Sequence, residues 1–175
     1  APVDPAKDKR FNLGFYGIAV NPNDGTVWGS NTAGRGWIVR VNLGSNPPVT
    51  ALTEAYQLPA GELGIRGMDM DSKGIAWAAG TGGNLISFDR SKCRVRNGPT
   101  ATGDHCPEGF TLYPLPGPRF EGVEGPLATV ASPYYLWVDM HDIFGLGKDT
   151  VIVFDNQSDG MQAFANGKWV HLAIP

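Results

Sequence analysis

The chain has 175 residues, 24 of them glycine and 14 proline, so these two types make up about 22% of it against a usual share of about 12%. An apolar fraction of 42% excludes a disordered chain, and a net charge of −3 argues against a nucleic-acid-binding protein. No apolar run approaches the roughly 20 residues of a membrane-spanning helix. We therefore expect a soluble, turn-rich and mostly β protein.

A segment near the N-terminus is repeated further along the chain. Residues 17–28 and 67–77 share a glycine, alternating apolar residues, an Asn/Asp-rich turn, a second glycine and a tryptophan. Residues 36–42 and 84–90 follow them with matching alternation. Alternation with a period of two, in segments rich in β-branched and aromatic residues, predicts β-strands.

The C-terminal part carries a weaker third copy. Its four expected strands are residues 135–139, 149–154, 160–165 and 168–173. The Asn166-Gly167 pair between the last two is a strong signal for a two-residue β-hairpin turn.

Four short antiparallel strands per repeat of about 40–60 residues are typical of a β-propeller blade. The predicted fold is all-β and propeller-like, with about three four-stranded antiparallel blades in an incomplete or open ring. We expect Gly17 and Gly67 near the central channel, where strands crowd together. The expected organisation is an N-terminal extension (1–11) and one domain (12–175) with blades at about 12–60, 64–117 and 134–175 and a linker at 118–133.

Specific residues of the first two copies match the repeat of a known group. In the first copy they are Gly17, Ile18, Ala19, Val20, Asp24, Gly25, Val27, Trp28, Ile38, Arg40, Val41 and Asn42. In the second copy they are Gly67, Met68, Asp69, Asp71, Gly74, Trp77, Leu85, Phe88 and Asp89. The chain resembles the virginiamycin B lyase-like (streptogramin lyase-like) propellers, grouped with NHL-type and gluconolactonase-type propellers, over about residues 12–90 and more weakly over 134–175. The resemblance implies the fold; the family's cluster of His, Glu and a basic residue has no residue-by-residue match here.

Two pairs of side chains are candidates for chemistry. Asp139 and His141 alternate onto one face if their strand continues, and a histidine with carboxylates can bind a divalent metal or act as a general base. Asp69 and Asp71 also alternate onto one face and could ligate Ca²⁺ or Mg²⁺. We favour structural roles for both pairs, in a solvated loop and in a capped turn where Asp71 corresponds to Asn21. No residue is assigned to catalysis or to a cofactor.

Cys93 and Cys106 are the only two cysteines, and they enclose an irregular, polar stretch that contains Gly and Pro. This pattern predicts a disulfide-closed loop between the third and fourth strands of the second copy. A disulfide indicates an oxidising, extracytoplasmic location, either periplasmic or secreted. The alternative is a pair of free thiols in a cytosolic protein.

Closed propellers need about four to eight blades, so three blades leave two blade faces and strand edges open. The chain is then a piece of a longer propeller, a self-associating module, or an accessory subunit that docks on other proteins. We favour a non-enzymatic binding or scaffolding module of a larger assembly. The alternative is a metal-dependent lyase or lactonase-type enzyme that uses Asp69, Asp139 and His141. A third hypothesis is a carbohydrate-binding module. For the five tryptophans we expect packing between blades.

Overall fold

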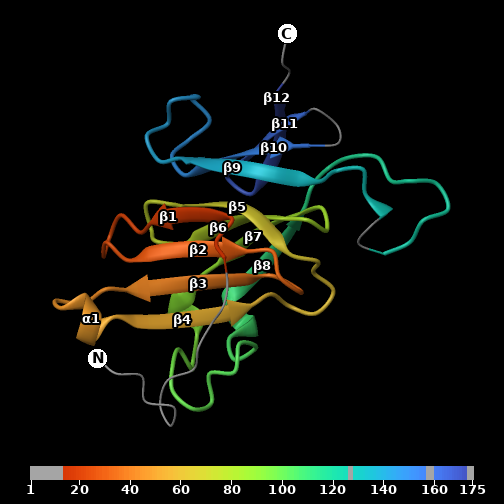
Figure 1. Cartoon of the computed structure of the whole chain (residues 1–175). Coiled ribbons are helices and arrows are strands. Elements are labelled where there is room, and N and C mark those ends of the chain that lie inside the picture. The colour runs from red at the N-terminus through yellow and green to blue at the C-terminus, as the bar shows by residue number, and fades with distance from the viewer. Residues whose placement is uncertain (1–13, 126–127, 157–159, 173–175) are drawn as a thin grey trace.

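The computed structural model describes residues 14–125, 128–156 and 160–172 (Figure 1). These residues form three antiparallel sheets of four strands, and the strands of each sheet are hydrogen-bonded in chain order. The predicted all-β fold of three four-stranded blades is confirmed, and the three sheets do not close a ring. The predicted extension of residues 1–11 lies outside the described residues.

Each blade is one sheet. Blade 1 contains β1 (Gly17–Val20), β2 (Val27–Asn31), β3 (Trp37–Asn42) and β4 (Leu52–Gln57), with the short α1 (Pro47–Thr50) before β4. Blade 2 contains β5 (Ile65–Met70), β6 (Ala76–Gly80), β7 (Asn84–Phe88) and β8 (Phe110–Pro114), with the 3₁₀ turns η1 (Arg90–Lys92) and η2 (Pro107–Gly109) before β8. Blade 3 contains β9 (Pro133–Asp139), β10 (Thr150–Asp155), β11 (Met161–Ala165) and β12 (Lys168–Leu172). Among the described residues, the helices lack the length and hydrophobicity needed to cross a bilayer.

The hairpin turns follow from local side-chain chemistry. The Asn166-Gly167 turn has φ angles of 50° and 76°, the left-handed values that a two-residue hairpin of this type requires. In the β1–β2 turn, Asn21 Oδ1 accepts a hydrogen bond from the Asn23 backbone at 2.9 Å. The Asn166-Gly167 hairpin turn is present as predicted, and in the β1–β2 turn the Asn21 side chain closes the turn.

The innermost strands of the three blades, β1, β5 and β9, lie next to one another in that order. A Cβ atom on Gly17 would lie 2.9 Å from the Met68 backbone nitrogen, and one on Gly67 would lie 2.9 Å from the Tyr135 Cα. These separations leave no room for a side chain. The predicted crowding at both glycines is confirmed.

Two apolar cores fill the spaces between adjacent blades. The core between blades 1 and 2 includes Trp28, Tyr56 and Phe88, each fully buried. The core between blades 2 and 3 is lined by Leu85, Leu136, Val138, Val151 and Phe164, with Trp77 and Trp169 partly buried against it. Packing between blades is thus the role of these three tryptophans, as expected. Trp137 differs, because 37% of its surface is exposed on the far side of blade 3.

The predicted disulfide between Cys93 and Cys106 is present. The loop that it closes belongs to blade 2 but reaches the outer strand of blade 1. The Gly103 carbonyl accepts a hydrogen bond from the Gln57 backbone at 2.8 Å, and the His105 ring packs 5.0 Å from the Tyr56 ring. The loop therefore fastens blade 2 to β4.

A partly buried ion pair fastens the same two blades. Arg90 lies just before the disulfide-closed loop. It donates hydrogen bonds to the Glu54 carboxylate of β4 through Nε at 2.5 Å and through Nη2 at 2.6 Å. The Tyr56 hydroxyl also donates to Glu54, at 2.7 Å. Burial raises the pKa of the Glu54 carboxyl, but the hydrogen bonds from Arg90 and Tyr56 outweigh this effect and hold the pKa below its ordinary value.

A first prediction concerns Gly67. In Gly67→Ala the new methyl group would meet the Tyr135 backbone, so β5 and β9 must separate, and we expect a loss of about 1–3 kcal/mol in the free energy of unfolding. Urea denaturation measures this difference. Gly14→Ala is the matched control, because a Cβ there has no neighbour within 4 Å. Equal stability of the two variants would contradict the close approach of the inner strands.

Candidate functional site

Asp139 ends β9 and is completely buried. Its Oδ1 accepts a hydrogen bond from the His141 backbone at 3.2 Å, and its Oδ2 accepts one from the Phe144 backbone at 2.9 Å. Burial raises the pKa of Asp139, but backbone hydrogen bonds, including those from Phe144 and His141, outweigh it and keep the pKa below its ordinary value. The carboxylate thus holds the loop between β9 and β10 in shape.

His141 lies exposed in that loop. Its contact with Asp139 is made by the backbone N–H and not by the imidazole ring. The two residues are therefore neighbours, but the hydrogen bond between them holds the loop in shape and does not involve the imidazole ring.

Asp71 caps the turn that follows β5. Its Oδ1 accepts hydrogen bonds from the backbones of Lys73 at 2.9 Å and Ile75 at 2.8 Å, and its Oδ2 accepts one from Trp77 Nε1 at 3.1 Å. Asn21 makes the corresponding contact in blade 1. This is the turn-capping arrangement that the repeat favoured.

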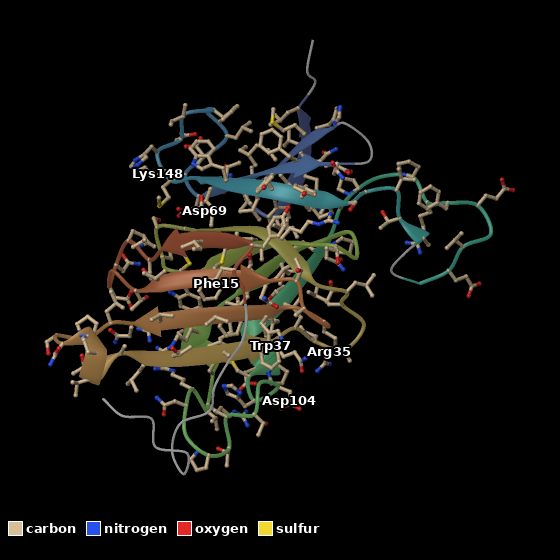
Figure 2. All side chains as sticks on the ribbon, viewed as in Figure 1. Phe15, Arg35, Trp37, Asp69, Asp104 and Lys148 are labelled. Carbon is tan, nitrogen blue, oxygen red and sulfur yellow. A yellow bond between two sulfur atoms is a disulfide. The ribbon has the colours of Figure 1, made fainter. Side chains whose placement is uncertain are left out.

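Asp69 points from β5 toward blade 3, and Figure 2 shows it close to β9. Its Oδ2 accepts a hydrogen bond from the Val138 backbone at 2.9 Å, and its Oδ1 accepts one from Met70 at 2.8 Å. Among the described residues, no group of three or more His, Cys, Asp or Glu side chains could hold a metal ion. A Ca²⁺ or Mg²⁺ site at these positions stays a prediction.

A different set of side chains converges at one end of the three inner strands. We call Tyr16, Arg66, Tyr134 and Tyr135 the inner-strand cluster. The Tyr16 ring lies 5.9 Å from the Tyr134 ring and 6.1 Å from the Tyr135 ring, and the Arg66 guanidinium carbon lies 4.6 Å above the Tyr134 ring. Tyr16 and Tyr135 are 38% and 53% exposed, so a small molecule can reach them.

The inner-strand cluster combines one cation with aromatic rings and phenol groups. Arg66 is absent from the salt bridges that the described part of the chain forms, and its Nη1 lies 3.4 Å from Ser132 Oγ. Hydrogen bonding with Tyr134, together with burial, raises the pKa of the Tyr16 phenol above its ordinary value. A guanidinium beside ring faces suits a ligand with a negative or strongly polar group on a flat ring.

The sequence contained one signal for this cluster. Tyr16 and Arg66 immediately precede Gly17 and Gly67, so they occupy the same position in two copies of the repeat. A side chain at that position lies at the end of an inner strand in each blade.

The sequence matches no family model and no curated protein. Among solved structures, the chain is similar to a selenomethionine-substituted virginiamycin B lyase from Staphylococcus aureus, with a TM-score of 0.62 and 15% identity over 95% of this chain and 43% of that chain. It is also similar to a streptogramin B lyase structure, with a TM-score of 0.50 and 14% identity over 97% of this chain and 57% of that chain. The likeness shows the fold alone: the three sheets match part of the β-propeller of these lyases, and the chain spans about half the length of those proteins.

The lowered pKa of Asp139 predicts a pH-dependent effect of Asp139→Asn. A group whose pKa is depressed in the folded protein stabilises the fold above its ordinary pKa, and this stabilisation is lost as the pH falls through the folded-state value. We therefore expect the variant to be less stable at neutral pH and the difference to shrink in acid. Urea denaturation at about pH 7 and about pH 3 measures it.

Glu124→Gln, at an exposed position, serves as the control for Asp139→Asn. A stability difference between wild type and Asp139→Asn that is the same at both pH values would contradict the assigned role of the carboxylate.

Proposed function

We propose that this chain is an extracytoplasmic, propeller-like binding and scaffolding module that joins a larger assembly through its two open blade faces. The observation that carries the proposal is the exposure of apolar positions whose equivalents in the other blades are buried.

The face of blade 1 that is turned away from blade 2 we call the leading face. Cross-strand register places eight residues on it: Ile18, Val20, Val27, Gly29, Val39, Val41, Thr53 and Ala55. Phe15 also covers it, because its ring fills the space beside Gly29, and Figure 2 shows it in front of the sheet. Val20 is 58% exposed, whereas the equivalent Met70 and Val138, each covered by a preceding blade, are 1% exposed.

The face of blade 3 that is turned away from blade 2 we call the trailing face. Its eight residues are Tyr135, Trp137, Ile152, Phe154, Met161, Ala163, Val170 and Leu172. Tyr135, Phe154 and Trp137 are 53%, 45% and 37% exposed. On the same side of blade 1, Trp28 is only 1% exposed because blade 2 covers it.

Neither face carries a charged residue. Val39 and Ala55 of the leading face and Ile152 and Ala163 of the trailing face are buried, so the exposed apolar surface is formed by Ile18, Val20, Tyr135, Trp137, Phe154 and Val170. Exposed apolar side chains clustered on a sheet face mark a protein interaction site, because such faces and edges otherwise lead to aggregation. The disulfide supports the extracytoplasmic part of the proposal, since such bonds persist in oxidising compartments.

Site-specific photo-crosslinking in the cells that make the protein tests the binding function. A photoreactive amino acid in place of Ile18 or Trp137 should form covalent adducts with protein. The same amino acid in place of Val49, which is 65% exposed in α1 and outside both faces, should form far fewer. Adducts no more frequent from positions 18 and 137 than from position 49 would contradict the proposal.

A second candidate function is a metal-dependent lyase or lactonase-type enzyme. The inner-strand cluster favours it, because an accessible arginine and three tyrosines gather at the end of the inner strands in a fold shared with streptogramin B lyases. If this candidate holds, the chain should convert virginiamycin B in the presence of a divalent metal, and Arg66→Met should lose most of that activity. Chromatography of the antibiotic measures both. No conversion by the wild type would rule this substrate out.

A further inference from the structure

We propose that the trailing face of one copy of this chain packs on the leading face of a second copy, so that two three-bladed halves close into one six-bladed ring. The inference rests on the proposed binding function and names its partner.

The two open faces are of opposite kinds. Within the chain, each interface joins the trailing side of one blade to the leading side of the next, as Trp28 of blade 1 meets Met68 and Phe88 of blade 2. Blade 3 offers a trailing side and blade 1 a leading side. A second copy can therefore supply the side that each of them lacks, in the orientation that the two internal interfaces use.

The sizes of the side chains on the two faces are complementary. The exposed part of the trailing face is largely aromatic, with Tyr135, Trp137 and Phe154. The strands of the leading face carry smaller groups, mostly Val, Ala and Gly, with Ile18 the largest of them, and Phe15 adds one aromatic ring beside Gly29. Large side chains on one surface and small ones on the other let two layers interdigitate at the density of a protein interior.

A structured loop enlarges the trailing face. Phe144 lies in the loop after β9, and its ring is 6.0 Å from the Trp137 ring. Asp139 and Asp142 hold this loop by accepting hydrogen bonds from the Phe144 and Gly147 backbones, at 2.9 Å and 2.7 Å. Ile143 beside it is 70% exposed. These apolar side chains are thus presented to a partner with little loss of conformational entropy.

The absence of charge limits what can cover these faces. A partner surface with ionised side chains would have to bury them without opposite charges, which is costly. The other open face of the same chain meets the requirement, because it too carries no charged residue.

The number of blades fits a pair. Two copies give six blades, within the four to eight of closed propellers. The similar lyase structures are about twice as long as this chain, which covers 43% and 57% of them. Two copies related by a two-fold axis would make two identical trailing-to-leading contacts and leave no blade face free, so the assembly stops at two.

Sedimentation equilibrium of the purified chain tests the pairing. We expect a particle of twice 18.7 kDa, and Val20→Glu and Trp137→Glu should each weaken association at least tenfold. Val49→Glu, outside both faces, should associate like wild type. Circular dichroism and urea denaturation check that each variant is folded.

Mixing the two face variants gives a sharper test. A Val20→Glu copy keeps its trailing face and a Trp137→Glu copy keeps its leading face, so a mixture should form pairs through one intact contact although neither variant pairs alone. Pairing that survives in Val20→Glu alone, or growth into longer polymers, would overturn the closed trailing-to-leading ring. So would a folded wild-type monomer at about 100 µM. If the wild type is such a monomer, photo-crosslinking from positions 18 and 137 separates the two proposals. Adducts with a protein of another mass would contradict the pairing of two copies but support the binding function. The absence of adducts would contradict the pairing and the binding function alike.

Discussion

Each blade of this protein is a sheet with apolar side chains on both of its faces, and such a sheet is stable only when another layer covers each face. Blade 2 meets this requirement completely, because blade 1 covers one side with Trp28 and Tyr56 and blade 3 covers the other with Leu136 and Val138. Among the described residues, blade 1 and blade 3 are each covered by another blade on one side. The order of the strands, the glycines of the inner strands and the positions of Trp28, Trp77 and Trp169 all serve this stacking of one blade on the next.

The stacking is reinforced by polar contacts that would be costly to leave unmade. Asp69 of blade 2 accepts a backbone hydrogen bond from blade 3, and Glu54 of blade 1 receives a bidentate hydrogen bond from Arg90 of blade 2. Asp149 of blade 3 likewise accepts hydrogen bonds from Ser72 of blade 2, at 2.8 Å from its backbone nitrogen and 2.6 Å from its hydroxyl. Removing one partner of a partly buried contact, such as Arg90 from Glu54, leaves an unsatisfied group, so these contacts add to the stability of the interfaces between blades.

The strands and turns were predictable because their causes are local. Alternation with a period of two and the Asn166-Gly167 turn are properties of neighbouring residues, and the two cysteines enclose a single loop. The inner-strand cluster was not predicted, because Tyr16 and Arg66 contact the tyrosines of β9 only after strands far apart in the sequence have packed together. The role of Asp139 in loop structure also depends on backbone amides whose direction the sequence pattern does not contain.

The disulfide-closed loop has a consequence for the edge of blade 1. Edge strands present unpaired backbone groups to which a strand of another chain can add. At the C-terminal end of β4, the Gln57 N–H is already bonded to the Gly103 carbonyl, and His105 lies against Tyr56. The covalent link between Cys93 and Cys106 keeps this loop short and in place. The outer border of blade 1 is thereby closed at this end to strand addition by another chain, a protection that lasts as long as the two sulfur atoms stay bonded.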